Sequence, residues 1–119
     1  MPNQEFKEKY TDQISVEQML EDLIPNFLKN KRADLEILTQ ALREQDYEKV
    51  KKIGHNWKGA CSSYGFIYLG EVGKQFEILA AHKDQEKLMT LITSLPKYLN
   101  NIKIDYICAP EDEERSLHK

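Results

Sequence analysis

Apolar residues recur at helical spacing over most of this chain, and this periodicity limits what it can fold into. If residues 47–64 form a helix at about 100° per residue, then Val50, Trp57, Cys61 and Tyr64 fall into one apolar stripe. Glycine and proline are scarce, with five and four residues, and the alternation typical of strands is hard to find. We therefore expect an all-α fold.

Four long amphipathic helices are expected, preceded by one short additional N-terminal helix. The short helix would begin at about Ser15, a candidate N-cap. Asp46 and Asp84 are candidate N-caps of two long helices, and Pro96 should bend the last one. The long segments cover residues 25–44, 47–64, 66–81 and 85–102. Short loops between them favour an antiparallel, up-and-down four-helix bundle.

The length of 119 residues corresponds to one domain. This is too short to add a nucleotide-binding module, so no kinase domain is expected. We expect a flexible N-terminal extension over residues 1–14, the helical bundle over 15–107 and an acidic C-terminal tail over 108–119.

Charge and cysteine usage exclude several classes of partner. The net charge is −3 with both signs present, so the basic excess needed for nucleic-acid binding is lacking. No apolar run approaches the roughly 20 residues that span a membrane. The two cysteines, Cys61 and Cys108, favour a reduced compartment over a disulfide scaffold, and they make no metal-ligand spacing with the three histidines. We expect a cytoplasmic protein without a metal or cofactor of its own.

His55 is the residue whose placement on its helix indicates chemistry. It points roughly 165° away from the centre of the apolar stripe, so its imidazole should be exposed. Lys51, Lys58, Gly59 and Ser62 share its surface. Lys58 would put a positive charge beside the ring, and Gly59 would keep the neighbouring space open. A helical glycine costs about 1 kcal/mol relative to alanine, so its presence there needs a reason.

The pattern His55-x-apolar-Lys58-Gly59, followed by Gly65, resembles the signature of histidine-containing phosphotransfer (HPt) domains, and the resemblance extends over about residues 15–105. These domains are phosphocarriers of multistep phosphorelays. The resemblance implies that His55 accepts a phosphoryl group from a phospho-aspartate of a receiver domain, in a hybrid sensor kinase or response regulator, and passes it to another receiver domain.

The resemblance also implies the roles of the remaining site residues. Lys58 would offset phosphate charge, Gly59 would give steric access, and Glu77 would orient the imidazole, since HPt domains often carry Gln or Glu 22 residues after the histidine. Such a carrier is a stoichiometric intermediate, not an enzyme. Mg²⁺ would be bound by the partner receiver domain, and a monomer is expected because the histidine face must stay free.

Two residues depart from the family pattern. Gly54 stands where alanine is common, and a second glycine near His55 would loosen the helix. Trp57 replaces a leucine-like residue and needs a roomier core contact, whereas Cys61 reads as a small core residue. The other histidines, His82 and His118, are interpreted as incidental.

Other functions remain open at this point. A helical adaptor could bind a receiver domain or another signalling partner without carrying phosphate. A dimerisation and phosphoacceptor part of a sensor kinase would need a downstream ATP-binding domain. A hydrolytic or redox enzyme is least favoured, because no nucleophile–histidine–acid arrangement and no glycine-rich phosphate loop is present.

Overall fold

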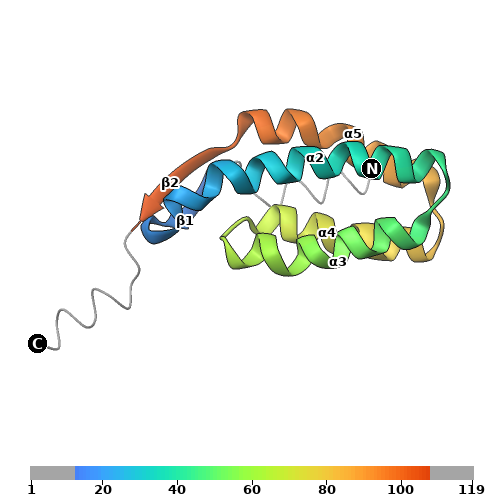
Figure 1. Cartoon of the computed structure of the whole chain (residues 1–119), viewed down its shortest axis with the longest axis horizontal. Helices are drawn as coiled ribbons and strands as arrows, with labels where there is room; N and C mark the ends of the chain where they lie inside the picture. The colour runs from blue at the N-terminus through green and yellow to red at the C-terminus, as the bar shows by residue number, and fades with distance from the viewer. Residues whose placement is uncertain (1–12, 108–119) are drawn as a thin grey trace, which may run out of the picture.

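The computed structural model describes residues 13–107. The predicted acidic tail lies outside this range, as do Cys108, His118 and all but the last two residues of the predicted N-terminal extension. The described elements are β1 (Gln13–Glu17), the 3₁₀ helix η1 (Gln18–Leu23), α2 (Ile24–Arg43), α3 (Tyr47–Ser63), α4 (Ile67–Ala81), α5 (Gln85–Asn101) and β2 (Lys103–Ile107) (Figure 1).

The four long helices begin and end close to the predicted positions, because their ends carry local signals. The Asp46 carboxylate accepts a hydrogen bond from the Lys49 N–H at 3.1 Å, which confirms the predicted N-cap of α3. Asp84 caps α5 in the same way. Gly65 follows α3 with φ 94°, a conformation that favours glycine. Helix α5 continues through Pro96.

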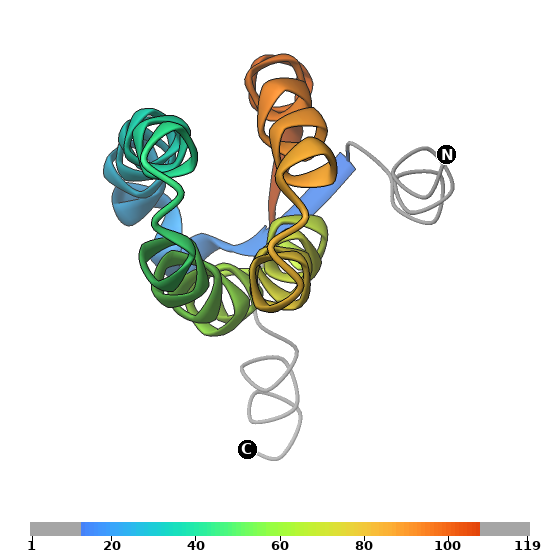
Figure 2. The same ribbon diagram turned by 90° about the vertical axis from the view of Figure 1, so that its right-hand side faces the viewer.

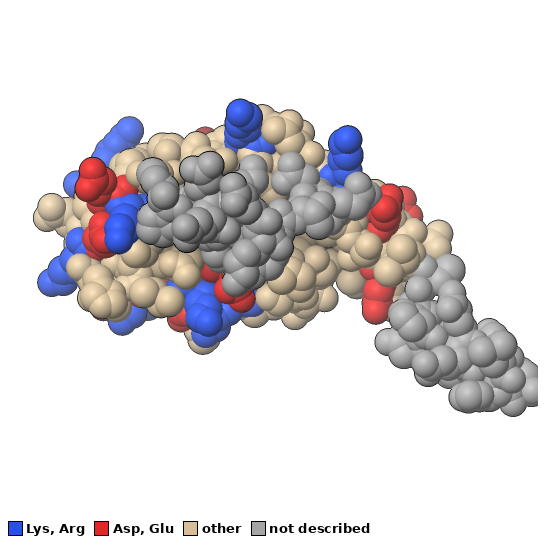
Figure 3. Space-filling view, turned by 180° about the vertical axis from the view of Figure 1, so that it is seen from behind, with Lys and Arg blue, Asp and Glu red and all other residues tan. Residues whose placement is uncertain are grey.

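The four helices form a ring in cross-section. Each helix contacts the next one along the chain, and α5 also contacts α2 (Figure 2). Their apolar faces enclose the core, in which Trp57, Phe66 and Phe76 are the largest fully buried side chains. On the part of the surface that Figure 3 shows in colour, acidic and basic side chains are interspersed. No helix within residues 13–107 is long and apolar enough to span a membrane.

A short N-terminal helix is present as the 3₁₀ helix η1 (Gln18–Leu23), but its predicted start at Ser15 is wrong. The chain there forms β1, which pairs in parallel with β2 at one end of the molecule, with Ile14 opposite Ile104 (Figure 1). Ile14 and Val16 are buried and Ser15 is exposed, the alternation of a strand. Five residues are too few to show this period clearly, and the partner strand lies about 90 residues away. The fold is therefore mostly helical with a two-stranded sheet, not all-α, and a 3₁₀ helix follows β1.

Candidate functional site

His55 lies on the outer face of α3 with its side chain 76% exposed. Trp57, two residues further along, is fully buried on the inner side of the same helix. The exposure predicted from helical phase is thus confirmed for His55. An imidazole in this position is open to a partner along most of its surface.

Glu77 connects the site residues of two helices. Its side chain reaches from α4, where Oε2 lies 3.1 Å from His55 Nδ1. Its other oxygen, Oε1, lies 3.3 Å from Lys58 Nζ, which belongs to α3. The Glu77 side chain is 25% exposed, whereas Lys58 is about half-exposed. The structure therefore brings together three of the four predicted site residues around one carboxylate.

The hydrogen bond to Glu77 distinguishes the two nitrogens of His55. When Nδ1 carries the proton, it donates to the carboxylate, and Nε2 keeps its lone pair. A carboxylate that holds one ring nitrogen fixes both the tautomer and the orientation of a histidine. The free Nε2 can then act as a nucleophile toward a group presented from solvent.

The Glu77 carboxyl is charged at neutral pH. Partial burial acts to raise the pKa of Glu77, but hydrogen bonds and charge from Lys58 and His55 outweigh this effect and hold the pKa below its ordinary value. The ionised form is the one that accepts hydrogen bonds from both partners at once. Glu77 is therefore kept as an acceptor for the His55 ring.

The space beside His55 is open at Gly59. A Cβ added to Gly59 would have no neighbouring atom within 4 Å, so this glycine is not required for helix packing. Of the lysines near His55, Lys51 lies 3.8 Å from Glu48 on its own helix. Lys58 is the lysine that joins the His55–Glu77 pair. The geometry agrees with the predicted roles of Lys58 and Gly59, which stay predictions.

The Hpt domain family model matches residues 22–105, which include both helices of this site. The chain belongs to the Hpt domain family. Hpt domains act in phosphotransfer within phosphorelay signalling, as carriers rather than as catalytic enzymes, and they interact with receiver domains. No curated protein and no solved structure shows a significant match to the chain.

In this Hpt domain, α3 and α4 approach each other through glycines. A Cβ on Gly54 would lie 2.6 Å from the carbonyl oxygen of Gly73, and a Cβ on Gly73 would lie 2.6 Å from the carbonyl oxygen of Gly54. Gly70 faces the side chain of Ser62 further along the same contact. Gly54 was predicted only to loosen the helix, and its role in packing α3 against α4 was not predicted. The signal was the set of glycines on two successive helices.

A polar cluster supports α3 from the side opposite to His55. The Trp57 indole donates from Nε1 to Asp34 Oδ2 at 2.8 Å, and Lys31 Nζ lies 3.5 Å from the same oxygen. The core position predicted for Trp57 is confirmed, but its polar partners on α2 were not foreseen. Cys61 is buried as predicted, and burial raises the pKa of its thiol to about 12.

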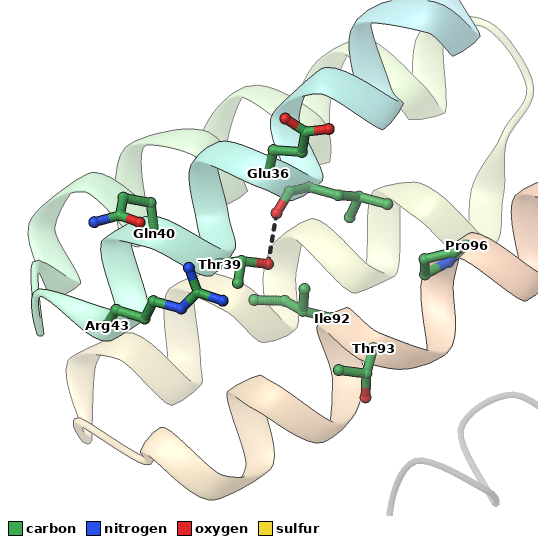
Figure 4. A pocket seen from close by; sticks show the side chains of 8 residues that line it. Glu36, Thr39, Gln40, Arg43, Ile92, Thr93 and Pro96 are labelled. Carbon is green, nitrogen blue, oxygen red and sulfur yellow. Dashed lines mark hydrogen bonds between the residues drawn. The ribbon is translucent and has the colours of Figure 1, made fainter.

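Other polar groups of the Hpt domain stand apart from His55. His82 Nδ1 lies 2.9 Å from the carbonyl oxygen of Ile78 at the end of α4. A groove between α2 and α5 has Leu35 and Ile92 among its lining residues and Arg43 from α2 (Figure 4). Its lining residues come from other helices than His55 and Glu77. Among residues 13–107, no three His, Cys, Asp or Glu side chains are placed to hold a metal ion.

Proposed function

We propose that this Hpt domain carries a phosphoryl group on Nε2 of His55. The group would come from a phospho-aspartate of a receiver domain, in a hybrid sensor kinase or response regulator, and would pass to an aspartate of another receiver domain. The observation that carries the proposal is the exposed imidazole whose Nδ1 lies 3.1 Å from a carboxylate, which leaves Nε2 as the reactive nitrogen.

The proposed transfer needs no separate base, because the attacking ring nitrogen carries no proton. The lone pair of neutral His55 Nε2 attacks phosphorus, and the bond from phosphorus to the aspartate oxygen breaks, so the aspartate leaves as a carboxylate. The ring keeps its Nδ1 proton and becomes a positively charged phosphoimidazole. The negative charge of Glu77, 3.1 Å from Nδ1, stabilises that cation. Return transfer reverses these steps.

Lys58 is proposed to offset the charge of the incoming phosphoryl group. Its ammonium lies 3.3 Å from Glu77 and is about half-exposed, so it can turn toward a group on His55. Phosphoryl transfer depends chiefly on positioning and on neutralising charge. We propose that the rest of this neutralisation, including Mg²⁺, comes from the partner receiver domain. The carrier would act as a cytoplasmic monomer, since a second copy on the His55 face would block the receiver.

Labelling from a phosphorylated receiver domain tests the proposal. The chain should acquire acid-labile, base-stable phosphate, and His55→Gln should lose it. His82→Gln is a matched control, because His82, at the C-cap of α4, is also exposed and has a hydrogen-bonded Nδ1. It should label like the unaltered chain.

Two other results would contradict phosphate transfer through His55. If His55→Gln labels as well as the unaltered chain, the assignment of the histidine is wrong. If no phosphate appears but the receiver domain still binds, and binding survives His55→Ala, the chain is an adaptor. Binding can be measured by titration calorimetry with the same receiver domain.

A further inference from the structure

A close approach between α3 and α4 lies directly beside the candidate site. Gly54 precedes His55, and a Cβ on Gly54 would meet the Gly73 carbonyl oxygen at 2.6 Å and Phe76 Cβ at 2.7 Å. A Cβ on Gly73 would in turn lie 2.7 Å from the Lys58 backbone nitrogen. Most of these neighbours are backbone atoms, which cannot swing aside as the end of a flexible side chain can. The separation of the helices here therefore depends on glycine.

The same contact includes the backbone of Glu77. A Cβ on Gly54 would be 3.1 Å from the backbone nitrogen of Glu77, so the backbone that carries this carboxylate rests against Gly54. Restoring an ordinary contact of 3.4 Å to the Gly73 oxygen requires a displacement of about 0.8 Å. Added to the 3.1 Å between His55 Nδ1 and Glu77 Oε2, this exceeds the usual hydrogen-bond range of about 2.7–3.2 Å.

We infer that Gly54 is a positioning residue: by admitting the backbone of α4, it sets the distance at which Glu77 holds the His55 ring. This role belongs to the resting geometry of the domain and does not depend on the proposed phosphotransfer. Gly59, five residues further along α3, does not share this property, because a Cβ there has open space around it. The two glycines beside His55 thus differ in what they do.

Gly54→Ala and Gly59→Ala form a matched pair for the test. Both add one methyl group to the same helix, but only Gly54→Ala pushes α4 away. ¹⁵N NMR of the His55 ring reports the ratio of the two neutral tautomers, and ¹³C NMR reports the pKa of the Glu77 carboxyl. In Gly54→Ala we expect the ratio of the Nδ1–H tautomer to the Nε2–H tautomer of His55 to fall about fivefold, which is equivalent to losing one net hydrogen bond. The pKa of Glu77 should rise toward its ordinary value.

Gly59→Ala should change neither reading. A purely structural role of Gly54 would lower thermal stability but leave the tautomer ratio and the pKa of Glu77 as they are, and that result would overturn the inference. Gly73→Ala is the reciprocal variant, since its methyl group would meet the Gly54 carbonyl, and it should reproduce both changes. Both variants are to be measured with trimethylamine N-oxide, which favours the folded state. If neither Gly54→Ala nor Gly73→Ala folds in the presence of trimethylamine N-oxide, the inference is also overturned.

A phosphorylation arm separates this inference from the proposed function. If His55 is the phosphoacceptor, Gly54→Ala should be labelled about tenfold more slowly, as expected when a partner that orients a reacting histidine is lost. Gly54→Ala in a Glu77→Ala background should cause no further slowing. If the unaltered chain takes up no phosphate, the proposed function fails, while the NMR comparison still decides the role of Gly54.

Discussion

Asp34 is the counter-charge of a cation that the fold buries, and removing it should be costly. Lys31 is 5% exposed, and its ammonium lies 5.3 Å from the ring centre of Phe27 and 5.5 Å from that of Trp57. The Asp34 carboxylate lies 3.5 Å from this ammonium and accepts the Trp57 indole proton at 2.8 Å. Asp34→Ala would leave both groups without this partner.

The expected loss of stability follows from these two interactions. Breaking a buried ion pair costs about 3–5 kcal/mol, and leaving an indole N–H unsatisfied costs about 1–3 kcal/mol. The Asp34 side chain is 23% exposed, so water compensates part of each of these two losses. We expect about 3 kcal/mol for Asp34→Ala and about 1.5 kcal/mol for Asp34→Asn, which still accepts from Trp57 but lacks the charge. Lys31→Met removes the buried cation and leaves Asp34, which is partly exposed to water and still accepts from Trp57, so it should cost less than about 1 kcal/mol.

Urea unfolding at neutral pH measures these differences. Far-UV circular dichroism follows the helices, and Trp57, the single tryptophan, reports its own surroundings by fluorescence. In the Lys31→Met background, Asp34→Asn should cost about 1 kcal/mol less than in the unaltered chain. An equal loss in both backgrounds would refute a charge interaction between Lys31 and Asp34. A loss below about 0.5 kcal/mol for Asp34→Ala would refute the importance of the whole cluster.

Three further predictions concern the site and its helix. Because the pKa of Glu77 is lowered in the folded chain, its stabilising contribution is present above the ordinary pKa of 4.5 and is lost as pH falls through the folded value. The difference in free energy of unfolding between the unaltered chain and Glu77→Gln should therefore narrow in acid; a constant difference would contradict this. Burial raises the pKa of the Cys61 thiol to about 12. In a Cys108→Ser variant, this thiol should therefore resist iodoacetamide at pH 8 and react fully in guanidinium. Rapid labelling of the folded chain would contradict the burial of Cys61. Gly59→Ala should raise the free energy of unfolding by about 1 kcal/mol, because alanine favours the helix and has open space there. Gly59→Leu should stay folded but slow phosphate transfer to His55. Unchanged transfer to the Gly59→Leu variant would contradict the role of Gly59 in access.

The helices could be predicted because their signals are local. The carboxylates of Asp46 and Asp84 each bind a backbone N–H three residues ahead, so the cap and the helix start are read from neighbouring residues. The outward direction of His55 followed from the phase of the apolar stripe on its own helix. Strand β1 was missed because its hydrogen-bond partners lie on β2, near the other end of the described chain.

The site was only partly predictable. Glu77 was named through the family resemblance and not through spacing, since a separation of 22 residues across a turn does not reveal where two helices cross. The glycines show why. A Cβ on Gly54 or Gly73 would lie 2.6 Å from the carbonyl oxygen of the other, so neither glycine can be interpreted without the other helix.

Local hydrogen bonds and apolar periodicity were enough to place His55 on the outside of a helix, since a helix is specified by residues within a few positions of one another. The His55–Glu77 contact, the Trp57–Asp34 hydrogen bond and the pairing of β1 with β2 join residues that are distant in sequence. Such contacts depend on the close packing of whole faces, which residues within a few positions of one another do not specify.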